Sequence, residues 1–117
     1  MTAASGKRPK PVDQCQDVHE ILDQIRLRPK MRLRQRSLRD LQILLLGYGV
    51  ALDVHGIDEE FEWRPVGPFA QWLEARFGWP MALGWAAAVE EHADGEDPLD
   101  VFFRLRDEYR AVSRERA

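Results

Sequence analysis

One stretch of the sequence, from Ile25 to Gly56, constrains the fold more than any other. Seven cations lie between Arg26 and Arg39, and no acidic residue interrupts them. The most apolar run of the chain, Leu41 to Leu52, follows directly. An apolar run of this kind, bounded by polar residues, is typical of a buried helix. The stretch therefore predicts a basic segment that leads into the central helix of a helical fold.

Length and composition fit a single soluble domain. The chain has 117 residues, of which 44% are hydrophobic and 32% are charged, as in ordinary globular proteins. The single cysteine, Cys15, excludes an intrachain disulfide and favours a cytoplasmic location. Residues 1–14 lack the apolar segment of a secretory signal, and the central apolar run is too short to cross a membrane. We therefore predict a flexible tail over residues 1–15 and one helical domain over residues 16–117.

The net charge of −3 conceals a division of charge along the chain. Residues 1–40 carry a net charge of +5, and residues 41–117 carry a net charge of −8. The two parts could neutralise each other within the fold, or one of them could face a partner.

Apolar periodicity and capping residues predict five helices. Asp17 and Glu20 form a capping box that begins the first helix, and Pro29 ends it. Ser37 is a suitable N-cap for the central helix, and Gly56 a suitable closing residue. Apolar residues occupy most of the circumference of this central helix, so we expect it to be buried on most sides. The other three helices are expected from Pro68 to Phe77, from about Met81 to Ala93, and from Pro98 onward.

The segment from Lys30 to Arg36 shows a different pattern, with arginines at every second position. In an extended chain, this spacing would send the three guanidinium groups to one side. The sequence contains no second strand of comparable clarity, so the segment is either a loop or a short edge strand. The arginines of this predicted basic contact patch are Arg32, Arg34 and Arg36.

An acidic segment follows the central helix, and two aromatic residues, Phe61 and Trp63, are interleaved with its carboxylates. Carboxylates beside exposed aromatic rings are typical of a surface that binds a basic partner. The alternative, which we favour for the aromatic residues, is that both are anchors in the core. The predicted partner-binding residues are Asp58, Glu59, Glu60, Glu62 and Trp63.

No residue pattern indicates catalysis or a cofactor. The histidines His19, His55 and His92 fall in different predicted elements and lack the spacing of a metal site. The glycine-rich motifs that bind nucleotides and the G-x-S-x-G motif of hydrolases are also missing. We therefore predict no metal, no cofactor and no enzymatic activity.

The basic stretch 26–39 supports an alternative function, a nucleic-acid-associated regulator that contacts phosphates. Two observations disfavour it. The whole chain is acidic, and the stretch contains no aromatic residue on which a base could stack.

Several short motifs resemble those of a group of small bacterial proteins of unassigned function. Their pattern is I-R-x-R-P-x-M-Y-L-G, followed by a serine, leucines and a G-Y pair. This chain departs from it at Arg32, where the pattern has tyrosine, and at Arg34, where it has glycine. The segments Phe69–Leu73 and Phe102–Tyr109 are similar to that group as well. The matching residues are Ile25, Arg26, Arg28, Pro29, Met31, Leu33, Ser37, Leu38, Leu41, Gly47 and Tyr48.

Some members of this group look like immunity proteins encoded beside bacterial toxins. The resemblance thus implies a protein that neutralises a toxin by covering its active site. Together with the acidic segment, it leads us to predict a non-enzymatic, cytoplasmic protein-binding module whose carboxylates meet a basic cleft. The sequence does not indicate the oligomeric state.

Overall fold

The computed structural model describes residues 8–116, and it divides the chain into two compact units, Met1–Arg36 and Ser37–Ala117. Five α-helices confirm the predicted, mostly helical fold, and residues 8–116 contain no strand. These units differ from the division predicted from the sequence, a tail over residues 1–15 and one domain over residues 16–117. That predicted division stays a prediction. Residues 1–7 of the predicted tail lie outside the described residues. The two units are described separately below.

The first unit is built on helix α1, Val18–Leu27. Its predicted N-cap is confirmed, because Oδ1 of Asp17 accepts a hydrogen bond from the backbone N–H of Glu20 at 3.0 Å. Such a cap satisfies one of the N–H groups that a helix start leaves without a partner. The helix ends just before Pro29, as predicted. Its buried residues are Val18, Leu22 and Ile25.

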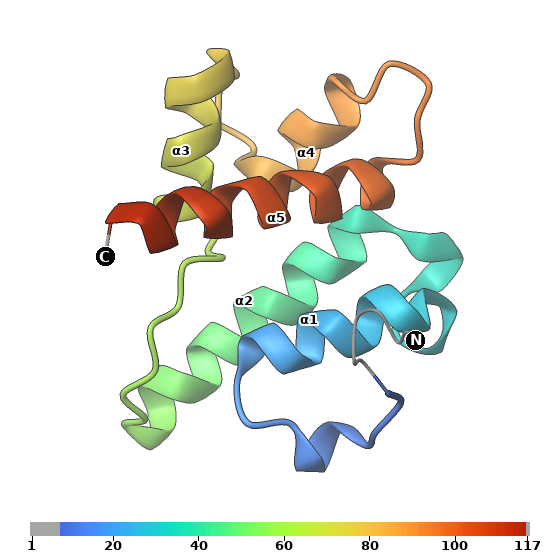
Figure 1. The fold of residues 1–117 in the computed structure, drawn as a ribbon, viewed down its shortest axis with the longest axis vertical. Coiled ribbons are helices and arrows are strands. Elements are labelled where there is room, and N and C mark those ends of the chain that lie inside the picture. The colour runs from blue at the N-terminus through green and yellow to red at the C-terminus, as the bar shows by residue number, and fades with distance from the viewer. Residues whose placement is uncertain (1–7, 117) are drawn as a thin grey trace. The chain divides into compact units, whose positions relative to one another are not determined.

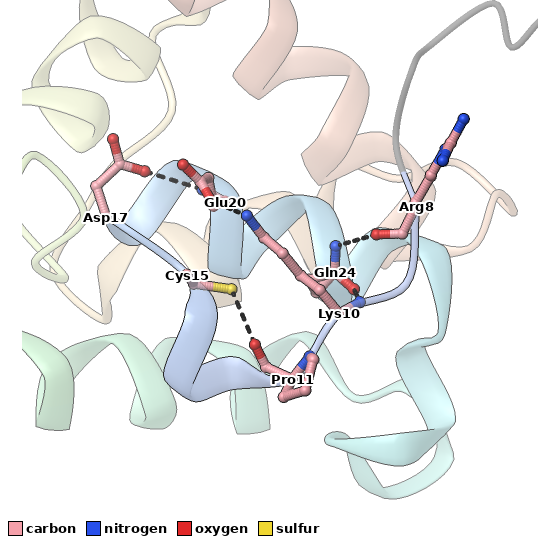
Figure 2. A network of polar contacts seen from close by, with 7 residues as sticks. All are labelled: Arg8, Lys10, Pro11, Cys15, Asp17, Glu20 and Gln24. Carbon is pink, nitrogen blue, oxygen red and sulfur yellow. Dashed lines mark hydrogen bonds and ion pairs between the residues drawn. The ribbon is translucent and has the colours of Figure 1, made fainter.

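The chain before α1 is attached to this helix by side-chain hydrogen bonds (Figure 2). The amide of Gln24 accepts a bond from the backbone N–H of Lys10 at 2.9 Å and donates one to the carbonyl of Arg8 at 2.8 Å. The Lys10 ammonium also pairs with the carboxylate of Glu20, and this hydrogen bond raises the pKa of Lys10. A short 3-10 helix, η1, covers Val12–Gln14 within this segment.

The basic segment after α1 forms turns and is not extended. Two 3-10 helices, η2 (Pro29–Met31) and η3 (Arg34–Arg36), cover most of it. The backbone N–H groups of Arg32 and Leu33 both donate to the carbonyl of Pro29, at 3.1 and 2.9 Å. Without a neighbouring strand, the backbone satisfies its hydrogen bonds locally. Of the two structures that the sequence left open, the loop is therefore present, and the expected one-sided array of arginines is wrong.

The described part of the second unit contains four α-helices (Figure 1), namely α2 (Leu38–His55), α3 (Pro68–Phe77), α4 (Gly84–Glu91) and α5 (Pro98–Arg116). In the view of Figure 1, α5 runs between α2 on one side and α3 and α4 on the other, and it contacts all three. None of the helices described between residues 8 and 116 is long and apolar enough to cross a membrane.

An aromatic cluster forms the core of the second unit. The ring of Phe69 lies at its centre, 5.0 Å from Trp63 and 5.7 Å from Phe102 between ring centroids. The indole of Trp85 stacks on Phe102 at 4.9 Å. These four side chains are fully buried. Large aromatic side chains supply much of the apolar burial that a unit of this size needs.

Helix α2 begins and ends as predicted but is buried on one side only. Oγ of Ser37 caps its start, and Gly56 ends it in the left-handed conformation at φ 61°. The buried leucines of α2 share one face, whereas four apolar side chains on the opposite face are exposed. The expectation of burial on most sides is therefore wrong. Helix α2 has more apolar side chains than the other helices of such a small unit can bury.

Helix α4 is shorter than the predicted helix 81–93, because its start is set by a contact with α2. Gly84 has a φ of 88°, and a Cβ there would lie 2.8 Å from Oε1 of Gln42. The same oxygen accepts a hydrogen bond from the backbone N–H of Ala86 at 3.0 Å. A side chain of α2 thus caps α4, and the helix begins at Gly84 instead of Met81.

Candidate protein-contact surface

The acidic segment, residues 57–64, connects α2 to the turn before α3 without helix or strand. The exposure of its side chains alternates over much of its length. Asp58 and Glu60 are exposed, Glu59 and Phe61 are half-buried, and Trp63 is buried. A period of two is the pattern of a chain that presents one side to solvent and the other to a core.

The first anchor of the acidic segment is Tyr48 of α2. Its hydroxyl lies 2.7 and 2.8 Å from the two carboxylate oxygens of Glu59, and its ring stacks on Phe61 at 5.6 Å. A Cβ at Gly49 would lie only 2.8 Å from the Phe61 ring. Glycine at this position therefore lets the segment approach the helix closely.

The second anchor is Tyr109 of α5, whose hydroxyl donates a hydrogen bond to the carboxylate of Glu62. Burial and this hydrogen bond together raise the pKa of Tyr109. The hydroxyl therefore stays protonated and remains a donor to the carboxylate. The backbone of Glu62 is also fixed, because its carbonyl accepts a hydrogen bond from the N–H of Phe69 at 3.2 Å.

Trp63 is the third anchor, and the structure removes it from the predicted contact surface. Its side chain is 0% exposed, and its carbonyl accepts a hydrogen bond from the indole N–H of Trp85 at 3.0 Å. A fully buried ring has no surface to offer to a partner. The favoured alternative, a core anchor, is confirmed for Trp63, whereas Phe61 is only half-buried.

Arg64, the last residue of the acidic segment, contacts both α2 and the Phe61 ring. Its guanidinium lies 3.2 Å from a carboxylate oxygen of Asp53 and 5.4 Å from the centre of the Phe61 ring. Both charged groups of this ion pair are substantially exposed, so the pair adds little to stability. Its consequence is that Asp53 is partly neutralised, whereas Asp58 and Glu60 remain in solvent.

The predicted basic contact patch lies in the first unit. Arg32 and Arg34 are exposed and Arg36 is half-buried. Gln35 and Arg36 both have positive φ values, 52° and 57°. This conformation breaks the alternation on which the one-sided patch depended. Of the residues in this segment that carry the resemblance, Leu33 is buried whereas Met31 is 64% exposed.

The polar groups in the described part of the chain show no arrangement that suits metal chemistry. No group of three or more histidine, cysteine, aspartate or glutamate side chains there could hold a metal ion.

His92 and Cys15 both have partners within the fold. Nδ1 of His92 lies 2.9 Å from the carbonyl oxygen of Ala88, and the His92 ring stacks on Trp79 at 4.6 Å between ring centroids. Burial raises the pKa of the Cys15 thiol, which lowers its reactivity at neutral pH.

Sequence reasoning missed the two tyrosines that hold the acidic segment. From the sequence, Tyr48 and Tyr109 are identified only as residues of the motifs that carry the resemblance. The signal that could have identified them is chemical. A tyrosine on a buried helix face needs a hydrogen-bond partner for its hydroxyl, and the glutamates of the acidic segment are acceptors that could serve as that partner.

The protein-family models, curated proteins and solved structures with which the chain was compared include no match.

Proposed function

We propose that this protein is a non-enzymatic binding module that recognises a basic protein surface through its acidic segment. The observation that supports the proposal most strongly is the anchoring of this segment. Glu59 and Glu62 are hydrogen-bonded by tyrosines from two different helices. Glu60 lies between these two anchored residues and Asp58 directly precedes the first, and both carboxylates are thereby presented to solvent on a fixed backbone.

A fixed backbone favours binding because less conformational entropy is lost when the complex forms. The charge of the segment also fits this function, since complementary charges speed association and select against wrong partners. Exposed apolar side chains lie at both ends of the segment: Ile57, its first residue, is 54% exposed, and Val66, two residues beyond its end, is 61% exposed. Apolar contact surrounded by polar groups is the usual composition of a protein interface.

The more specific proposal is an immunity protein that covers the basic cleft of a toxin. It draws on the resemblance described above and on the charge of the segment. Nucleases and other enzymes that bind phosphates have basic clefts, to which carboxylates are complementary. Inhibition would then need only steric and electrostatic coverage of the cleft, without a catalytic residue in this chain.

The direct test is to mix the purified chain with the protein encoded beside its gene and to measure complex formation by size-exclusion chromatography. We expect a stable complex at low salt that dissociates faster as the salt concentration rises, because exposed charges are screened. A matched variant that carries Asp58→Asn and Glu60→Gln keeps the size of both side chains and should bind more weakly. The specific proposal is wrong if the neighbouring gene product does not bind.

The alternative, a nucleic-acid-associated regulator, requires phosphate contacts from Arg32, Arg34 and Arg36. Fluorescence anisotropy with labelled DNA and RNA tests it. Binding that falls steeply with salt and disappears when all three arginines are replaced by alanine would favour this alternative. Absent or salt-independent binding would remove it.

A further inference from the structure

The exposed face of α2 carries an apolar stripe that the proposed contact surface does not use. We define the stripe as the side chains of Ile43, Leu46, Val50 and Val54. Their exposed fractions are 64%, 42%, 49% and 72%, respectively. At 100° per residue, these four positions fall within an arc of about 80°. A row of apolar side chains in solvent on one helix face marks an interaction site more often than isolated exposed residues do.

The backbone of the stripe permits close approach by another helix. Gly47 lies on the same face, and a Cβ built there would meet nothing within 4 Å. It is exposed, as is Ala51 in the next turn. Small residues between larger ones produce the grooves into which the ridges of a second helix pack.

The charges at the two ends of the stripe indicate what covers it. Arg39 lies one turn before Ile43, and its side chain is 64% exposed even though it pairs with Glu90. Asp58, which is also exposed, follows the other end of α2. A parallel pair of α2 helices would bring like charges together at both ends. An antiparallel pair would place Arg39 of each copy beside the acidic end of the other, so this stripe is complementary to itself.

We propose that the α2 stripe is the interface of an antiparallel homodimer, related by a two-fold axis near the middle of the helix. Such an isologous contact pairs Ile43 of one copy with Val54 of the other and places Val50 near Leu46. From Ile43 to Val54 the stripe is only about 16 Å long. An interface of this length is small, so we expect a reversible dimer with a dissociation constant on the order of micromolar.

The dimer does not rest on the proposed function, because it concerns the purified chain alone. Asp58, which is exposed and follows α2 in the sequence, enters both proposals, but Val50 belongs only to the stripe. Replacement of Val50 therefore separates the two proposals. A chain that fails to dimerise can still bind its basic partner, and a chain without a partner can still dimerise.

Sedimentation velocity over a range of protein concentrations tests the proposal. The wild-type mass should rise from 13.6 kDa toward twice that value. Val50→Glu should increase the dissociation constant by about a hundredfold, since it brings two carboxylates into the contact. Leu83→Glu is the matched control, because Leu83 is 79% exposed outside α2, and this variant should dimerise normally. Circular dichroism confirms that both variants fold.

A charge exchange tests the antiparallel orientation. Arg39→Asp and Asp58→Arg should each weaken the dimer about fivefold, and the double variant should recover most of the loss. A wild-type chain that remains monomeric at every concentration would overturn the proposal, and its stripe would then serve another partner. Equal effects of Val50→Glu and Leu83→Glu, or a double variant weaker than both single variants, would overturn it as well.

Discussion

The basic segment after α1 and the acidic segment after α2 make an instructive pair. Each follows a helix, each has charged residues at close spacing, and neither forms a strand in the structure. The basic segment closes hydrogen bonds onto itself in two 3-10 turns. The acidic segment makes no such turns over residues 57–63. Side chains from α2 and α5 hold it instead.

The difference comes from the residues between the charges. In the acidic segment, Phe61 and Trp63 alternate with carboxylates. The burial of Trp63 and the stacking of the half-buried Phe61 on Tyr48 fix the backbone at two points. In the basic segment the intervening residues include only one buried side chain, Leu33. Local hydrogen bonds therefore determine the conformation of the basic segment, whereas tertiary packing determines that of the acidic one.

Removal of the deepest anchor should have the largest effect. Trp63→Ala should lower the free energy of unfolding of the second unit by about 3–5 kcal/mol, because it leaves a large cavity among the core rings. Met31→Ala in the basic segment is the control, and it should change the free energy by less than about 0.5 kcal/mol. Urea denaturation followed by circular dichroism measures both. Similar losses in the two variants would contradict the contrast between the segments.

The close approach at Gly49 should be the next most sensitive feature. Gly49→Ala places a Cβ against the Phe61 ring, and such overpacking should cost about 1–3 kcal/mol. Gly47→Ala in the same helix meets nothing and should stabilise the chain by up to about 1 kcal/mol through helix propensity. Thermal unfolding of dilute samples, in which any dimer is dissociated, compares the pair. A stabilised Gly49→Ala variant would show that Phe61 is not held against α2.

Prediction from the sequence succeeded where the signal is local. The caps at Asp17 and Ser37, the end at Gly56 and the start at Pro68 depend on residues within one turn of each other, and all are confirmed. The late start of α4 was not predictable, because Gln42, more than forty residues earlier, caps it. For the same reason, composition identified the acidic segment but not the tyrosines that anchor it.

The Tyr109 anchor should make stability depend on pH. The folded chain binds the hydroxyl proton more tightly than the unfolded chain, because the pKa of Tyr109 is raised above its ordinary value of 10.0. Its contribution to stability is therefore complete below about pH 10 and is lost as the pH rises further, toward the folded-state pKa. Tyr109→Phe should lower stability by about 1 kcal/mol near neutral pH and remove this part of the alkaline loss. Urea midpoints at about pH 7 and pH 11 measure both effects. An unchanged alkaline loss in Tyr109→Phe would contradict the role of this hydroxyl.

The ion pair between Arg64 and Asp53 should matter least. The Asp53 side chain is 70% exposed and that of Arg64 is 40% exposed, so Asp53→Asn should change the free energy of unfolding by less than about 0.5 kcal/mol. The measurement is again urea denaturation, at low and at high salt. A loss as large as that of Tyr109→Phe would mean that the outer contacts of the acidic segment hold it as strongly as the inner ones.

The central claim is that the acidic segment, and not the basic one, contacts the partner. Isothermal titration calorimetry with the protein encoded beside this gene tests it most directly, with two multiple variants compared. We expect Asp58→Lys combined with Glu60→Lys to weaken binding at least about tenfold. Alanine at Arg32, Arg34 and Arg36 should leave the affinity unchanged. The reverse result, a loss of binding only in the arginine variant, would contradict the account.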